Sequence, residues 1–154
     1  MNLSDNIGLY KMGLKGRGAA FSGKRQRTGC ALIYLATPYS HEDATVREMR
    51  FKEVNKCAAS LMGSGMHIFS PISHTHPIAV EGDLLKGWEF WEKYDRKMLA
   101  SCDGVIVLQQ DGWKESTGVQ AEIKIAEELG IPVEYIEHNR GIGGKLSTYD
   151  QGWV

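Results

Sequence analysis

The sequence predicts an α/β domain, a flavodoxin-like or Rossmann-like three-layer sandwich with a parallel sheet of four to five strands. Short, wholly apolar runs alternate along the chain with longer segments whose apolar residues recur at helical spacing. Strands that are apolar on both faces are typical of parallel sheets covered by helices on each side. With 154 residues, of which 42% are hydrophobic, the chain is large enough to bury one such core.

The first predicted strand is the run ALIYLA at residues 31–36. A helix should follow, because Ser40 and Asp43 form an S-x-x-D start signal. Gly63 and Gly65 are expected to end this helix. Its apolar residues keep near-helical spacing, as shown by Val46, Val54, Cys57, Ala58 and Leu61.

The second predicted strand is MHIF at residues 66–69, and we expect His67 to be a core residue of this strand. The stretch SPISHTHPIAVEGD at residues 70–83 reads as a loop because it is rich in proline and polar residues. A second helix is predicted over residues 84–101.

The third predicted strand is GVIVL at residues 104–108. Thr117 and Gln120 form a T-x-x-Q capping box, so the third helix should begin near residue 118 and continue to Leu129. The run PVEYI at residues 132–136 is the fourth predicted strand.

Composition divides the chain into three segments. Residues 1–30 carry six Lys or Arg against one Asp, and we expect a flexible basic arm. Residues 31–138 form the α/β domain, and residues 139–154 form a polar, Gly-rich tail. Because the whole chain has a net charge of −1, the domain is net acidic. This balance argues against a nucleic-acid groove in the domain and leaves the arm as the basic segment.

The cysteine and hydropathy patterns bear on the compartment. Cys30, Cys57 and Cys102 are odd in number and lack metal-site spacing, so we expect buried thiols in a reducing environment. No apolar run has the length of a membrane span, and no signal-peptide pattern is present. These observations predict a cytoplasmic protein without a membrane partner.

Glu122 is the first candidate for chemistry. Its neighbours three and four positions away, Val119, Ile125 and Ala126, are apolar. We expect it at the edge of the buried helix face, where nearby helix N–H groups would favour its ionised form. Ligands of open parallel sheets bind beyond the carboxyl ends of the strands, so Glu122 is a candidate nucleophile. The alternative is a carboxylate that only decorates the helix start.

Asp95 is the second candidate. It stands in the middle of an apolar stripe that should face the sheet, formed by Trp88, Trp91, Met98, Leu99 and Cys102. Burying a carboxylate there is costly unless it is paired or has a role. The helix should return Asp95 to the carboxyl edge of the sheet, where Glu122 is also expected. The alternative is a structural acceptor for Trp, Tyr or backbone N–H groups.

Three stretches carry a resemblance to a known family. IYLATPYS, YDRKMLASCDGVIVL and DGWKESTGVQAEIKIAEELGIPV resemble the nucleoside 2-deoxyribosyltransferase superfamily, above all its largely uncharacterised bacterial and phage branch. The superfamily also includes nucleoside 5′-monophosphate N-glycosidases. The resemblance covers about residues 31–136. The last two motifs, in order and spacing, are fairly specific, whereas the first is weak alone.

The resemblance implies a reaction and roles. In the family, the Glu of a G-x-x-x-E segment attacks the anomeric carbon of a nucleoside and releases the base. Gly118 and Glu122 match this segment, which places Gly118 in the implied substrate site. Asp95 matches the family's Asp that orients the sugar and handles the proton of the leaving base. Two carboxylates acting through a covalent intermediate agree with a retaining mechanism. Relatives complete their sites across subunits, which implies a homodimer or a higher homo-oligomer.

Ser116 departs from one branch of the family. Transferases of unphosphorylated nucleosides carry an Asp six residues before the nucleophile, whereas members that hydrolyse 5′-monophosphates carry a Ser that contacts the phosphate. A hydroxyl beside helix N–H groups suits a dianion, so Ser116 favours a nucleotide substrate. The alternative is a helix cap. The loop ATPYSHEDA lacks the Gly-rich sequence of many phosphate-binding members, and Tyr39 and Ser40 are expected to line the sugar site.

His74, His76 and Trp113 complete the predicted site. The two histidines, in SHTHP, are expected to line the ligand cleft as proton donors or phosphate partners. A zinc site that adds Glu81 or Asp83 is an alternative, although a clear third ligand is lacking. Trp113 lies in the loop before the third helix, where it could stack on a base. GIGGKLS and GLKGRG fail as a phosphate loop and a dinucleotide fingerprint.

The sequence therefore predicts an enzyme without a cofactor or metal. It would cleave or transfer the N-glycosidic bond of a nucleoside or a nucleoside 5′-monophosphate. A rival from another class is a nucleotide-binding module without turnover, and a second rival is the zinc-dependent hydrolase that uses His74 and His76.

Overall fold

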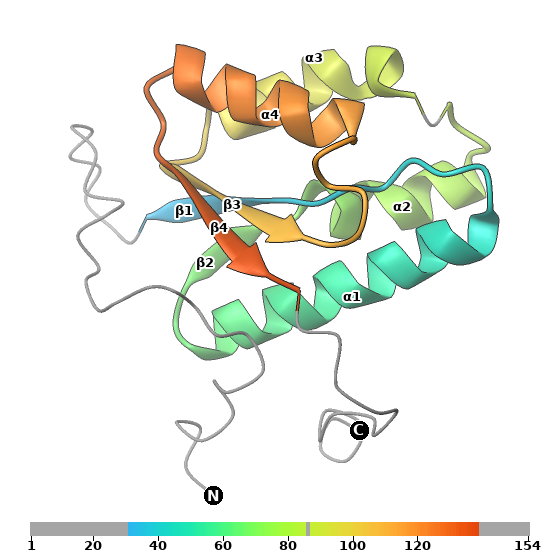
Figure 1. Cartoon of the computed structure of the whole chain (residues 1–154), viewed down its shortest axis with the longest axis horizontal. Coiled ribbons are helices and arrows are strands. Elements are labelled where there is room, and N and C mark those ends of the chain that lie inside the picture. The colour runs from blue at the N-terminus through green and yellow to red at the C-terminus, as the bar shows by residue number, and fades with distance from the viewer. Residues whose placement is uncertain (1–30, 86, 139–154) are drawn as a thin grey trace, which may run out of the picture.

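A computed structural model of the chain describes residues 31–85 and 87–138, and it confirms the α/β fold class. Four parallel strands form one sheet in the order β2-β1-β3-β4, as in a flavodoxin-like or Rossmann-like sandwich (Figure 1). The strands are β1 (Leu32–Ala36), β2 (His67–Phe69), β3 (Gly104–Gln109) and β4 (Val133–Glu137). The helices are α1 (Ala44–Gly63), α2 (Pro71–Glu81), α3 (Trp88–Leu99) and α4 (Thr117–Glu128). The predicted arm, the predicted tail and Cys30 lie outside the described residues.

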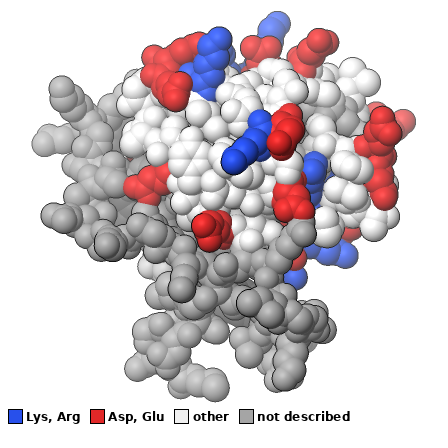
Figure 2. Space-filling model, viewed as in Figure 1, with Lys and Arg blue, Asp and Glu red and all other residues white. Residues whose placement is uncertain are grey.

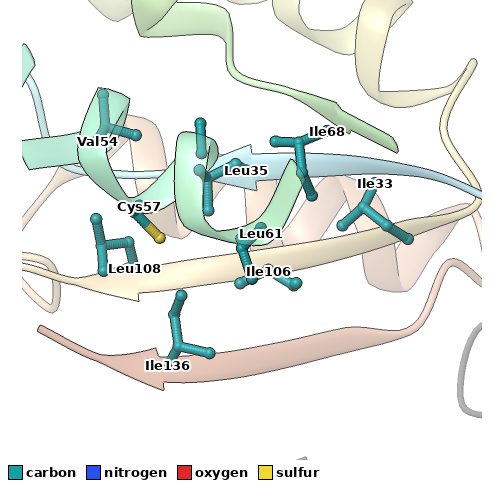
Figure 3. Packing of buried hydrophobic residues seen from close by; sticks show 10 residues of the cluster. Ile33, Leu35, Val54, Cys57, Leu61, Ile68, Ile106, Leu108 and Ile136 are labelled. Carbon is teal, nitrogen blue, oxygen red and sulfur yellow. The ribbon is translucent and has the colours of Figure 1, made fainter. Parts of the chain in front are cut away.

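Helices cover both faces of the sheet, which explains why the strands are apolar throughout. Because side chains alternate along a strand, β1 directs Ile33 and Leu35 to one core and Tyr34 and Ala36 to the other. Figure 3 shows the first core, in which α1 packs on the sheet through Val54, Cys57 and Leu61. On the opposite face lie α3 and α4 (Figure 1).

The strand order places β1 and β3 at the point where the chain reverses its direction across the sheet. From β1 the chain crosses to β2 on one side, and after β2 it passes over β1 to pair with β3 on the other side. Loops that leave adjacent strands at such a point diverge, and the crevice between them is where ligands bind in open α/β sheets.

Asp43, the last residue of the predicted S-x-x-D start signal, caps α1, whereas the motif placed the cap at Ser40. The Asp43 side chain accepts a hydrogen bond of 2.7 Å from the backbone N–H of Thr45. Ser40, the expected cap, lies three residues upstream of it. The predicted end is confirmed, because α1 ends at Gly63 and Gly65 adopts a φ of 93°.

Ser116 caps α4, and the predicted capping box of Thr117 and Gln120 is wrong. The Ser116 hydroxyl accepts a hydrogen bond of 3.3 Å from the Val119 N–H. The Gln120 side chain instead donates to the carbonyl of Trp113, at 3.1 Å. The helix therefore begins one residue earlier than the sequence motif indicated.

The stretch predicted as a loop after β2 is helix α2. Ser70 caps it by accepting a hydrogen bond from the Ser73 N–H at 3.3 Å, and Pro71 occupies the first turn. Proline is favoured there, since the first helical N–H groups have no partner within the helix. Pro77 lies inside the helix, so the proline content did not mark a loop. His67 was also misassigned, because it is exposed rather than part of the core.

The surface charge, the helix lengths and the cysteines of the described residues agree with what the composition indicated. On the face shown in Figure 2, acidic and basic side chains of the described residues are interspersed, without a continuous basic patch. Within residues 31–85 and 87–138, no helix combines the length and apolar character needed to cross a membrane. Cys57 and Cys102 are buried free thiols, as predicted.

Candidate active site

A cavity of about 580 Å³ lies at the carboxyl edge of the sheet, where the loops after β1 and β3 diverge. This volume is in the usual range for small-molecule sites. Its wall comes from the loop after β1, from α2, from the first turns of α3 and from the N-terminal end of α4. Seven of the predicted site residues line it: Tyr39, Ser40, His76, Asp95, Ser116, Gly118 and Glu122.

Glu122 points from α4 into this cavity and is buried, with 6% of its surface exposed. Burial raises the pKa of its carboxyl group to about 8, and the nearby charge of Asp95 raises it further, whereas a hydrogen bond from Tyr34 lowers it. The expectation that helix N–H groups would keep Glu122 ionised is therefore wrong at neutral pH. Desolvation of this buried carboxylate outweighs the helix dipole, whose effect is large only near exposed helix ends.

Asp95 lies on the buried face of α3, as its place in the apolar stripe predicted, and 9% of its surface is exposed. Burial raises the pKa of its carboxyl group to about 7. Because Glu122 and Asp95 influence each other's charge, the two titrate as a pair. Burial thus raises the pKa of both carboxyl groups toward neutrality, so a singly protonated pair, with one acid and one carboxylate, is accessible near neutral pH.

Tyr34 connects the sheet to this pair and was not among the predicted site residues. Its hydroxyl donates a hydrogen bond of 2.7 Å to Oε1 of Glu122. Burial, followed by the charges of Glu122 and Asp95, raises the pKa of Tyr34 well above its usual value. Tyr34 therefore stays protonated and acts as a donor, which favours the ionised form of Glu122. The signal in the sequence was an aromatic hydroxyl inside an otherwise aliphatic strand, LIYLA.

A second polar group lines the cavity from the side of α1 and α2. The Tyr39 hydroxyl lies 2.7 Å from Nδ1 of His76, and Nε2 of His76 lies 3.1 Å from Oε2 of Glu48. The His76 ring stacks on Phe51, with 4.2 Å between ring centroids. Both ring nitrogens of a buried histidine are thus occupied by side chains. Glu48 was not predicted, since an acidic residue on α1 is unremarkable in sequence.

His74 and Trp113 lie away from the other predicted site residues. His74 is exposed on α2 and stacks against Tyr94 at 6.3 Å. His74 and His76 are two residues apart, and residues at this spacing do not face the same side of a helix. The prediction of a loop for this segment did not take the helical spacing into account. Trp113 packs against Tyr135, with ring centroids 5.6 Å apart.

Two other tryptophans take the place expected of Trp113. Trp88 and Trp91, in the first turns of α3, line the cavity. A Cβ atom added at Gly118 would lie 3.7 Å from the Trp88 ring, an ordinary contact distance, so this ring lies beside the start of α4. Aromatic faces beside a cavity are suited to stacking on a planar ligand.

Among the described residues, neither a metal site nor a cluster of cationic side chains for an anion lines the cavity. Among them no group of three or more His, Cys, Asp or Glu side chains could hold a metal ion, and α2 directs His74 and His76 to different sides. Of the described side chains that line the cavity, four are carboxylic acids and none is Lys or Arg. The four acids are Glu89, Asp95, Glu115 and Glu122.

Comparisons with known proteins identify the family but name no activity. No curated protein matches the sequence. A family described as Domain of unknown function (DUF1937) matches residues 31–138, which include all the described strands and helices. The chain therefore belongs to the DUF1937 family.

Proposed function

We propose that the protein cleaves the N-glycosidic bond of a nucleoside, as an enzyme related to the nucleoside 2-deoxyribosyltransferase superfamily. The observation that carries this proposal is a pair of buried carboxyl groups, Glu122 and Asp95, that face one cavity at the carboxyl edge of the sheet. Two carboxyl groups that share one proton supply a nucleophile and an acid, which is what glycosidic bond cleavage requires.

In the first step, the ionised Glu122 attacks the anomeric carbon while the bond from that carbon to the base nitrogen breaks. The base leaves with the electron pair of this bond and takes a proton from Asp95. The product is a glycosyl ester on Glu122 with an ionised Asp95. The Tyr34 hydroxyl supports the role of Glu122, because its hydrogen bond stabilises the ionised form of this carboxyl group. Burial still leaves the pKa of Glu122, about 8, above that of Asp95, about 7, so a proton moves from Glu122 to Asp95 before the attack.

In the second step, an acceptor displaces Glu122 from the anomeric carbon. If the acceptor is water, the products are a free sugar and the regenerated enzyme, so the enzyme is a hydrolase. If it is a second base, the enzyme is a transferase. Each of the two displacements inverts the configuration at the anomeric carbon, so the overall outcome is retention.

The lining of the cavity supports an aromatic, uncharged substrate. Trp88 and Trp91 offer surfaces for the base, while Tyr39 and Ser40 offer hydroxyl groups for the sugar. The carboxyl groups would repel a phosphate dianion, and the described lining has no Lys or Arg to offset them. We therefore place unphosphorylated nucleosides before 5′-monophosphates, contrary to the expectation based on Ser116.

The oligomeric state and compartment are part of the same proposal. Large apolar side chains of α2, α3 and the segment between them are exposed, and a second copy of the chain would cover them in a homodimer or a higher oligomer. These are Ile78, Val80, Leu85 and Phe90. The buried free thiols of Cys57 and Cys102 are consistent with a reducing compartment such as the cytoplasm.

The test is release of free base. Purified protein is incubated with ribo- and deoxynucleosides and their 5′-monophosphates, with and without a second free base, and the products are separated by chromatography. We expect base release by the wild type and none by Glu122→Gln, which keeps the shape of the side chain. Binding of a nucleoside without any base release would contradict the proposal and would favour a binding module.

A further inference from the structure

Tyr39, His76 and Glu48 form a hydrogen-bonded chain to which the reaction described above assigns no proton transfer. It begins at the cavity, which Tyr39 and His76 line, and it continues through Nε2 of His76 to Oε2 of Glu48. We refer to these three residues as the Tyr39–His76–Glu48 chain. It contains two links of hydrogen-bond length, 2.7 Å and 3.1 Å.

The partners determine where the protons lie. A carboxylate only accepts hydrogen bonds, so Nε2 of His76 carries the proton and donates to Glu48. In the neutral ring Nδ1 is then the acceptor, and the Tyr39 hydroxyl must donate to it. The Tyr39 oxygen also accepts a hydrogen bond from the side chain of Arg47, and Tyr39 lines the cavity. The same order of carboxylate, imidazole and hydroxyl activates the hydroxyl of hydrolytic triads.

The chain is fixed at the cavity end and open to solvent at the other. His76 is 8% exposed, and its ring is held between the stacked ring of Phe51 and the edge of Tyr39. The side chain of Glu48 is 46% exposed and lies 3.4 Å from the Lys52 ammonium through its second oxygen. A proton that reaches Glu48 can therefore pass to bulk water, whereas packing against Phe51 and Tyr39 positions the imidazole beside the Tyr39 hydroxyl.

The chain also lies across the sheet edge from the nucleophile. Glu48 belongs to α1, which packs on one face of the sheet, whereas Glu122 belongs to α4 on the other face. An ester at the anomeric carbon is displaced from the side opposite the departing Glu122 oxygen. A base that approaches from the side of α1 and α2 is thus suitably placed to serve the second step.

We propose that the Tyr39–His76–Glu48 chain is a proton relay that activates the water molecule which resolves the glycosyl ester of Glu122. This inference rests on the proposed function and deepens it, because it makes the enzyme a hydrolase. The water oxygen bonds to the anomeric carbon, and the bond from that carbon to the Glu122 oxygen breaks, so that its electron pair returns to the carboxylate. The water proton moves to the Tyr39 oxygen as the Tyr39 proton moves to Nδ1 of His76.

Glu48 is a positioning residue in this scheme. It fixes the tautomer of His76 and stabilises the imidazolium that forms in the second step. The imidazolium then loses a proton through Glu48 to solvent, and Asp95 regains its proton from solvent before the next turnover. The sum of both steps is one nucleoside and one water converted to one base and one free sugar.

Separating the two steps in time tests the relay. Enzyme at tens of micromolar is mixed with a nucleoside substrate, and free base is measured from milliseconds to minutes after acid quenching. For Tyr39→Phe and His76→Asn we expect a burst close to one base per active site, followed by turnover about 100-fold slower than in the wild type. The slow phase should coincide with a persistent glycosyl adduct in the intact mass.

Matched controls separate the relay from a structural role. Tyr135→Phe and His67→Asn change the same residue types at exposed positions outside the cavity, and both phases should stay at wild-type values. Glu48→Gln keeps the ring and the hydroxyl in place, so it tests the relay even if the substitution at His76 prevents folding. We expect it to slow the second phase by about 10-fold and to leave the burst intact.

Two results would overturn the inference. If the burst and the slow phase fall by the same factor in all three variants, the chain only supports the structure. If all three variants turn over at the wild-type rate, another group activates the water. In both cases wild-type base release and its loss in Glu122→Gln still uphold the proposed function. If the wild type releases no base from any nucleoside or nucleotide, the proposed function fails, and the relay fails with it.

Discussion

The hydroxyl of Tyr34, in the middle of β1, donates a hydrogen bond of 2.7 Å to Oε1 of Glu122 on α4, although 88 residues separate the two in sequence. This bond joins the switch point of the sheet to the helix that carries the candidate nucleophile. It also opposes the effect of burial, which raises the pKa of Glu122 to about 8. The geometry thus keeps the pKa of this buried carboxyl group near neutral pH, where the group can be either an acid or a nucleophile.

The first prediction concerns Tyr34→Phe. A hydrogen bond to a charged group contributes about 1.5–3 kcal/mol, so kcat should fall roughly 10- to 100-fold. Because the lost bond lowers the pKa of Glu122, the acidic limb of the kcat profile should also move to higher pH. Steady-state kinetics from pH 5 to pH 9 would check both effects, with the exposed Tyr135→Phe as control. A limb that moves to lower pH would show that the bond favours the protonated form.

The second prediction concerns the stability of Glu122→Gln. The folded protein keeps the Glu122 proton up to about pH 8, whereas an unfolded chain releases it near pH 4.5. Wild-type stability should therefore fall as pH rises through this window, and it should level off above pH 8. The variant lacks this loss, so it should be more stable than the wild type by ~2 kcal/mol or more at pH 8 and by much less at pH 5.

Thermal unfolding of both proteins across this pH range is the measurement. Glu127→Gln changes an exposed carboxylate on the same helix and should follow the wild-type profile. Parallel profiles for the wild type and Glu122→Gln would mean that Glu122 has no raised pKa in the folded protein.

The third prediction concerns Ser116, which caps α4 through the Val119 N–H. Ser116→Ala should lower the free energy of unfolding by about 0.5–2 kcal/mol, whereas Ser116→Asp should retain stability because Asp is an equally good cap. The Asp variant adds charge at the cavity wall. It should therefore reduce kcat/KM for a 5′-monophosphate more than for the nucleoside.

The wild type should itself prefer the nucleoside, since four carboxyl groups line the cavity and the described lining lacks Lys and Arg. Competition between a nucleoside and its 5′-monophosphate gives the preference directly. A strong preference for the 5′-monophosphate would contradict this prediction and would restore the phosphate-binding role that the sequence suggested for Ser116.

The strands and the buried acid on α3 could be predicted from sequence because their signals are local. All four apolar runs became strands, and Asp95 interrupts an apolar stripe at a position that faces the sheet. Helix α2 was missed because its prolines and polar residues suggest a loop, whereas Ser70 and Pro71 in fact begin a helix. Local composition cannot distinguish these outcomes without the packing partner of the segment.

The chemistry of the site depends on contacts that no local pattern contains. Burial is the main cause of the raised pKa of Glu122, and this burial arises only when α3, α4 and β1 are packed together. The partners Tyr34 and Glu122 lie on different elements, as do His76 and Glu48. Sequence spacing could therefore suggest candidate residues, but their hydrogen-bond partners required the fold.

The most direct test of the account is the mass of the Glu122 peptide during turnover. The enzyme is mixed with a nucleoside that it cleaves, quenched in acid within milliseconds, digested with a protease and examined by mass spectrometry. The account predicts a peptide that is heavier by one glycosyl group, with the added mass on Glu122, and no such peptide from Glu122→Gln. Base release without any adduct on Glu122, or with the adduct on another residue, would contradict the assignment of Glu122 as nucleophile.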